Sequence, residues 1–130
     1  MRLAARLIRA WSARALAPAQ ILHLASDGAL ARVEGGVAID LRARRLLARL
    51  LARLAEPVLA RASSRAVSVD ALLEAGWPGE RTVGASGQRR LQVAISRLRE
   101  LGLRDVVETA DGGYAIAAGW EVRAADATAR

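Results

Sequence analysis

The fold of this chain is decided by one stretch of sequence, Arg89-Arg90-Leu91-Gln92-Val93-Ala94-Ile95-Ser96-Arg97-Leu98-Arg99. When its residues are placed at the roughly 100° intervals of an α-helix, the apolar side chains gather on one face. That face holds Leu91, Ala94, Ile95 and Leu98, with Leu101 at its margin. The opposite face holds Arg89, Val93, Ser96 and Glu100, and the flanks hold Arg90, Gln92, Arg97 and Arg99. The stretch therefore predicts a helix over about 85–101 that buries one face and exposes a polar, basic one.

The neighbouring residues predict a second helix before this one and a hairpin after it. Ser68 precedes a short amphipathic run that Gly76 ends, and Trp77-Pro78-Gly79 predicts a rigid turn. Further along, an Asp111-Gly112-Gly113 turn inside residues 105–117 predicts a β-hairpin. Two helices joined by a turn and followed by a hairpin are typical of a winged helix–turn–helix.

The first third of the chain predicts strands and one more core helix. Residues 20–41 alternate apolar and polar side chains between glycine-containing turns, which predicts three short strands. A leucine stripe then predicts a helix, which we expect Asp40 to cap and Pro57 to stop after about residue 55. Residues 2–16 place apolar side chains at every fourth position with arginines between them, which predicts a separate amphipathic helix.

These elements together predict an α+β fold. It is a winged helix–turn–helix with a small N-terminal antiparallel sheet, three core helices and a C-terminal β-hairpin wing, plus an extra N-terminal helix. The expected boundaries are 1–19 for the basic amphipathic helix, 20–118 for the winged-helix domain and 119–130 for a C-terminal tail.

The charge of the chain points to a polyanionic partner. All 20 basic residues are arginines, and the net charge is +7. The arginines are concentrated in residues 1–19, 42–65 and 81–104, three segments that all have helical patterns. A guanidinium is a planar fork suited to phosphate and to guanine, so double-stranded DNA is the expected partner.

Composition argues against several other classes of protein. The chain has no cysteine and one histidine, His23, so we expect no metal site, no cofactor and no catalytic triad, and hence no enzyme. The absence of phenylalanine and the single tyrosine leave few rings for stacking on unpaired bases. No apolar run is long enough to cross a membrane, and arginines interrupt the N-terminus before a signal-peptide core can form. We therefore expect a cytoplasmic, bacterial protein.

Residues 21–116 resemble the DNA-binding effector domain of OmpR/PhoB-type response regulators. The arginine-rich stretch quoted above is similar to the recognition helix of that family, and Gly76-Trp77-Pro78-Gly79 is similar to the end of its preceding helix. Thr109 and Gly113-Tyr114 are similar to the closing residues of its wing. The resemblance is to a branch found without receiver domains. It implies a transcriptional regulator that binds double-stranded DNA in a sequence-specific way.

The sequence also departs from the family pattern in the wing. The family carries an arginine beside the wing glycine, which enters the minor groove, whereas this chain has Asp111 there. An acidic residue at that place repels phosphates, so we do not expect the wing to read the minor groove. The wing is also one residue shorter, and no aspartate has the surroundings of a phospho-acceptor.

The exposed face of the 85–101 helix supplies the candidate DNA-binding residues. Arg89 and Gln92 are candidates for guanine and adenine edges, Val93 suits a thymine methyl group, and Ser96 suits either kind of contact. Phosphate contacts are expected from three further arginines, Arg90, Arg97 and Arg104.

A second hypothesis is a winged-helix module that binds protein and little or no DNA. Asp111, Glu100 and the acidic C-terminal tail favour it. The basic helix of residues 1–19 would then dock on a partner protein or form a homodimer contact.

Overall fold

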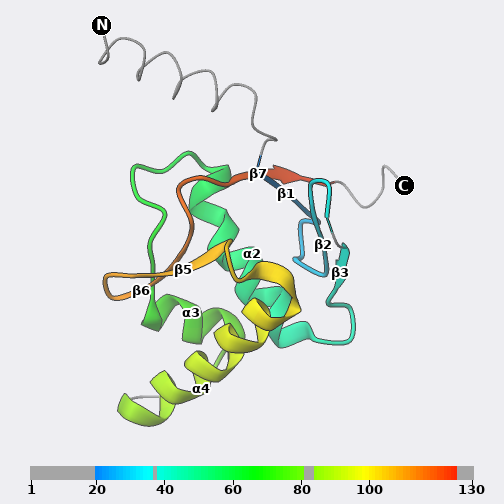
Figure 1. Ribbon diagram of the computed structural model, residues 1–130. Helices are drawn as coiled ribbons and strands as arrows, with labels where there is room; N and C mark the ends of the chain where they lie inside the picture. The colour runs from blue at the N-terminus through cyan, green and yellow to red at the C-terminus, as the bar shows by residue number, and fades with distance from the viewer. Residues whose placement is uncertain (1–19, 37, 81–83, 126–130) are drawn as a thin grey trace, which may run out of the picture.

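The computed structural model describes residues 20–36, 38–80 and 84–125, and these form an α+β fold. The extra N-terminal helix predicted over 1–19 lies outside the described residues. Within them are three α-helices, which are α2 (Arg45–Leu59), α3 (Val69–Gly76) and α4 (Gly84–Leu98). The helices lie between and below two β-sheets, with α4 at the opposite end of the molecule from the larger sheet (Figure 1). No helix in this part of the chain is long and apolar enough to cross a bilayer.

The larger sheet has four strands in the order β3-β2-β1-β7. The three strands predicted near the N-terminus are confirmed as β1 (Ile21–Leu24), β2 (Leu30–Val33) and β3 (Ala38–Asp40), and they pair antiparallel. The inner face of the sheet is apolar, with Leu22, Leu24 and Ile39 buried. The turn between β1 and β2 needs Gly28, because its φ is 76° and a Cβ there would lie 2.1 Å from the carbonyl oxygen of Ala48.

The fourth strand corrects the predicted C-terminal tail. Strand β7 (Glu121–Ala124) falls within residues 119–130 and pairs parallel with β1, from Ile21 opposite Glu121 to Leu24 opposite Ala124. Trp120 and Val122 are buried in the core that the sheet covers. Residues 119–125 are therefore part of the folded unit, because their apolar side chains complete its core.

Helix α2 begins and ends later than the sequence predicts. Asp40 does not cap it, because its carboxylate instead accepts a hydrogen bond from the backbone N–H of Arg42 and holds a turn before the helix. The helix also continues through Pro57 to Leu59. A proline here removes only one hydrogen bond near the end of the helix, and the buried residues Leu54 and Ala55 hold this turn on the core. The burial of Leu54 and Ala55 therefore stabilises the helix more than Pro57 destabilises it.

The smaller sheet contains the predicted hairpin and one strand that the pattern did not reveal. Strands β5 (Val107–Ala110) and β6 (Gly113–Ile116) pair antiparallel across the predicted turn, and β4 (Val67–Ser68) adds to the other edge of β6. Gly113 faces Ser68, where a Cβ would lie 1.9 Å from the carbonyl oxygen of Val67. This position needs glycine because the backbone of β4 passes too close for a side chain.

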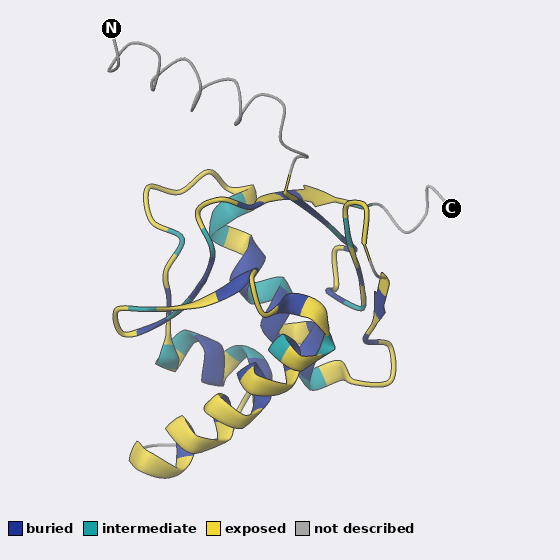
Figure 2. Ribbon diagram, viewed as in Figure 1, coloured by how far each residue is buried: buried dark blue, intermediate teal, exposed yellow. Residues whose placement is uncertain are grey.

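One apolar core joins both sheets and all three helices. Helix α2 lies at its centre and contacts α3, α4 and strands of both sheets. Its Leu50, Leu51 and Leu54 are completely buried. Helix α4 differs from α2 in its burial, because it is exposed over most of its length (Figure 2). The core therefore fixes one side of α4 and leaves the other side to solvent.

Candidate nucleic-acid interface

Helix α4 has the two faces that its sequence predicts. The apolar face, which contains Leu91, Ala94, Ile95 and Leu98, is buried. The exposed residues include every predicted contact residue on the helix, namely Arg89, Arg90, Gln92, Val93, Ser96 and Arg97. Val93 is the one large apolar side chain of α4 that stays open to water, with an exposed fraction of 52%. The fold therefore presents a continuous polar, basic surface with one apolar residue at its centre.

The sequence predicts that the helix runs to about residue 101 and closes on Gly102, and the helical path does break at Gly102. The α-helix spans Gly84–Leu98, and Arg99–Leu103 continue it as a kinked turn in which Gly102 has a non-helical φ of 126°. Only glycine adopts such a backbone freely. Leu103 is completely buried directly after it, so the turn redirects the chain into the core. The predicted phosphate contact Arg104 is exposed beyond this turn and does not belong to α4.

Helix α3 is capped at its start by Ser68 and followed at its end by Trp77. Ser68 caps α3, and its hydroxyl oxygen accepts a hydrogen bond from the backbone N–H of Ala71 at 3.1 Å. Trp77 follows the last residue of α3 and packs against the core. The two helices contact each other directly. The core thus holds α3 in place behind α4.

Arg90 has intramolecular partners that its place on the helix did not predict. Its guanidinium lies over the Trp77 ring, 5.2 Å from the ring centroid, and its Nη1 lies 3.0 Å from Oε1 of Glu80. Both partners belong to the segment that follows α3, so Arg90 ties this segment to α4. An exposed ion pair is worth about 1 kcal/mol or less, so a phosphate can compete with Glu80 for Arg90.

Arg99 connects the end of α4 to the hairpin. Its Nε donates a hydrogen bond to the carbonyl oxygen of Val107 at 3.0 Å, and its Nη2 donates one to Oγ1 of Thr109 at 3.2 Å. The guanidinium also lies 5.7 Å from the centroid of the Tyr114 ring. Sequence reasoning missed this role, because it placed Arg99 only on the flank of a helix. The threonine and tyrosine that it contacts were singled out only through the family resemblance.

The hairpin lies beside α4 with a small hollow between them. The hollow has a volume of about 230 Å³, and its lining includes Gln88 and Gln92 from the helix and Thr109 and Tyr114 from the hairpin. Asp111 is exposed in the hairpin turn. The helix thus supplies amide groups to the hollow while the tip of the hairpin carries a negative charge.

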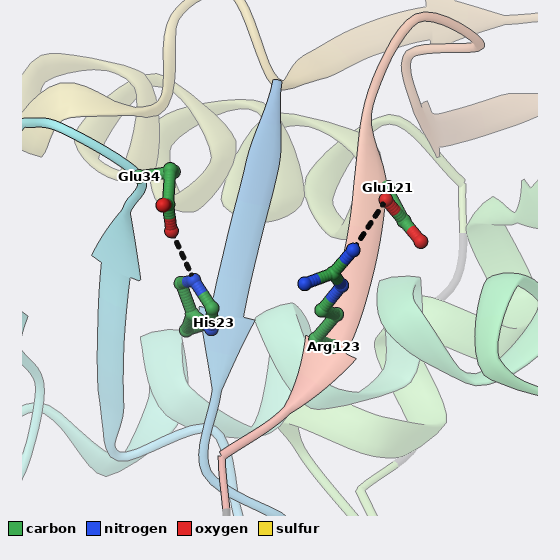
Figure 3. Close-up of polar contacts among 4 residues, drawn as sticks. All are labelled: His23, Glu34, Glu121 and Arg123. Atoms are coloured by element: carbon green, nitrogen blue, oxygen red, sulfur yellow. Dashed lines mark hydrogen bonds and ion pairs between the residues drawn. The ribbon is translucent and has the colours of Figure 1, made fainter. Parts of the chain in front are cut away.

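Acidic and basic groups are paired on the outer face of the larger sheet. His23 of β1 bonds Glu34 through its Nε2, and Arg123 of β7 lies against Glu121 (Figure 3). The hydrogen bond with His23 lowers the pKa of Glu34. These groups lie on the sheet, away from α4 (Figure 1). They form a solvated surface of mixed charge, in contrast to the basic surface of α4.

Two features of the ionisable side chains bear on metal binding and on charge in the described part of the chain. No cluster of three or more histidine or acidic side chains that suits a metal ion occurs among these residues. The strongest pKa shift belongs to Asp40, whose pKa falls to about 2 because Arg42 binds its carboxylate through the guanidinium and the backbone N–H. The Asp40–Arg42 pair stabilises the exposed turn before α2.

No protein-family model matches the chain, and no curated protein matches it.

Proposed function

We propose that this chain is a bacterial winged helix–turn–helix transcriptional regulator of the cytoplasm that binds double-stranded DNA. In this reading α3 and α4 are the helix–turn–helix, α4 is the recognition helix, and the β5–β6 hairpin is the wing. The proposal agrees with the resemblance to OmpR/PhoB-type effector domains. The observation that carries it is the exposed face of α4, which combines arginines, an amide, a hydroxyl and one apolar side chain.

That combination suits the major groove, which has the width to admit an α-helix. Arg89 and Gln92 carry bidentate groups that match guanine and adenine edges, and Val93 offers an apolar contact for a thymine methyl group. Ser96 accepts or donates a hydrogen bond to several bases. The proposed division is that these four specify sequence while Arg90, Arg97 and Arg104 bind phosphates.

The wing is proposed to support the helix instead of reading DNA. Its turn carries Asp111, and an exposed carboxylate there opposes the phosphates of a minor groove. Arg99 is directed inward to Val107 and Thr109, which positions the hairpin beside α4. Sequence selectivity is therefore assigned to α4 alone.

Selection from a random duplex library, at a stated salt concentration, tests this function. We expect enrichment of a motif, and an affinity whose logarithm falls linearly with the logarithm of the salt concentration, by about 0.9 for each phosphate contact. Two half-sites about one helical turn apart would show a dimer. Absence of any duplex binding at low salt would overturn the proposal and leave the protein-interaction module as the better hypothesis.

A further inference from the structure

An apolar hollow lies between α2 and α4, on the side of α4 that faces the start of α2. We call it the α2–α4 groove, and its volume is about 620 Å³. Its floor consists of Leu46, Leu47, Trp77, Val93 and Ala94. Leu47 and Ala94 are buried, whereas Leu46 and Trp77 are half-buried and Val93 is exposed. The groove thus offers apolar surface to a ligand without any change in the core.

The rest of the lining is basic. Arg44, Arg90 and Arg97 are its charged members, and none of the described residues that line it is acidic. Arg44 and Arg97 make no ion pair with any other residue that the structure describes, and Arg90 has only the exposed Glu80. The start of α2 adds to the positive potential, since its first turn contains no acidic residue. The ligand that this groove fits has apolar side chains flanked by negative charges.

We propose that the α2–α4 groove binds an acidic amphipathic helix of a partner protein. A groove between two helices, with an apolar floor and charged sides, is the geometry in which helices commonly bind. Leucine-type side chains of the partner would cover Leu46, Trp77 and Val93, and its glutamates or aspartates would pair with the three arginines. A fully exposed arginine gains little from one such pair, but arginines that flank an apolar contact gain more because water is excluded.

The charge and the apolar floor of the groove together disfavour the nearest alternatives. Residues 1–19 of this chain carry four arginines and no acidic residue, so they would be repelled by the groove. A second copy seated groove to groove would bring two sets of arginines together. DNA would satisfy the arginines, but phosphates and base edges offer little apolar surface to the floor. An acidic helix satisfies both parts of the lining.

The groove and the proposed DNA surface share three residues, Arg90, Val93 and Arg97. The partner and DNA must therefore exclude one another, a consequence that rests on the proposed function. Arg44, directly before α2, and Leu46 of α2 line the groove and lie off the proposed recognition helix. They allow the two ligands to be separated by mutation.

The experiment uses a fluorescein-labelled peptide of about 18 residues, long enough to form a helix, with leucines on one face and glutamates elsewhere. Its anisotropy is titrated with the full chain, without DNA. A peptide of the same composition with the leucines scattered around the helix is the control ligand. We expect the first peptide to bind and the control peptide to bind at least about tenfold more weakly, a difference of about 1.4 kcal/mol.

The variants are Arg44→Glu and, as the matched charge reversal on the outer face of the sheet, Arg123→Glu. Arg44→Glu should weaken peptide binding about tenfold or more, and Arg123→Glu should leave it nearly unchanged. Unfolding does not explain such a loss, because a glutamate at the start of α2 interacts favourably with the helix dipole. Circular dichroism and the melting temperature of each variant verify the fold.

Three results would overturn the proposal. They are no peptide binding at low salt, equal binding of both peptides, and equal loss in both variants. Competition with a random-sequence duplex then tests exclusion separately. Displacement of the peptide by the duplex supports mutual exclusion of the two ligands, whereas simultaneous binding of peptide and duplex overturns mutual exclusion. If the protein binds the peptide but no duplex, the proposal that the α2–α4 groove binds an acidic helix is supported, and only the proposed DNA binding is contradicted.

Discussion

The Nε of Arg99 donates a hydrogen bond to the backbone carbonyl oxygen of Val107 at 3.0 Å. This contact joins the kinked turn after α4 to the first strand of the hairpin. The same guanidinium bonds Thr109 and lies near the Tyr114 ring, so one side chain binds both strands of the hairpin. Arg99 therefore links the end of the proposed recognition helix to the proposed wing.

Replacing Arg99 with alanine should lower the free energy of unfolding by about 1.5–3 kcal/mol, because a part-buried hydrogen bond to Val107 and an exposed one to Thr109, both from a charged group, are lost. Urea denaturation measures this. Arg99→Lys should recover only part of the loss, since an ammonium does not reproduce the planar fork. Arg97→Ala is the control, because Arg97 is exposed on α4 and should change the stability by less than about 0.5 kcal/mol. Equal stabilities of the two alanine variants would contradict the role of Arg99.

The two neighbouring glycines of the hairpin should differ when replaced by alanine. Gly113→Ala places a Cβ 1.9 Å from the carbonyl oxygen of Val67, which forces β4 away from β6. We expect a loss of about 3 kcal/mol or more, at the upper end of overpacking effects. Gly112→Ala meets no atom within 4 Å and is strained only by its φ of 74°. It should cost about 1–2 kcal/mol, as measured by thermal denaturation. A larger loss for Gly112 would show that the strand pairing is wrong.

Two apolar residues of α4 separate stability from recognition. Leu91 is 1% exposed, so Leu91→Ala should lower the free energy of unfolding by about 2–5 kcal/mol. Val93 is 52% exposed, so Val93→Ala should change it by less than about 0.5 kcal/mol. On the proposed function Val93→Ala nevertheless weakens binding to a duplex with thymine at the contacted position. Denaturation and a binding titration on the same two variants check both parts. A large stability loss in Val93→Ala would contradict the orientation of α4.

Asp40 and Arg42 give a prediction for acid pH. The pKa of Asp40 lies at about 2 rather than 3.8, chiefly because the guanidinium of Arg42 binds its carboxylate. A lowered carboxyl pKa means that the pair stabilises the fold above pH 3.8 and that this contribution is lost as the pH falls towards about 2. In a carboxyl-carbon NMR titration, Arg42→Ala should move the Asp40 midpoint upward. The midpoint should stay below the ordinary value, because the backbone N–H of residue 42 remains a donor. An unchanged midpoint would rule out the pair as the cause.

The sequence predicted those features that depend on local periodicity. The faces of α4, the start of α3 at Ser68 and the β5–β6 hairpin all follow from spacing and turn residues, and the structure confirms them. Pairings between distant parts of the chain were not predictable in this way. Strand β7 pairs with β1 about a hundred residues earlier, and its pattern of one buried residue in four is too weak to reveal a strand.

The same limit applies to the candidate site. The exposure of Arg89, Gln92, Val93 and Ser96 followed from their place on a helical wheel. The hydrogen bonds of Arg99 to the hairpin could not be predicted from the helical wheel, because their acceptors lie on a strand eight and ten residues further along the chain. The contact of Arg90 with Glu80 was not predictable either, since Glu80 precedes α4 and does not lie on the same helix.

The central claim is that α4 reads DNA, and the affinity of Arg89→Ala for the selected duplex tests it most directly. Titrations compare this variant with Arg97→Ala and with Arg123→Ala, which removes one positive charge from the outer face of the sheet. Arg89→Ala should lose about 1–3 kcal/mol of binding free energy and tolerate a changed base at one position. Arg97→Ala should weaken all duplexes alike and reduce the salt slope by about one contact. Arg123→Ala should match the unmodified protein. Equal affinities of the Arg89 and Arg123 variants, with the same base preference, would contradict the assignment of α4 as the recognition helix.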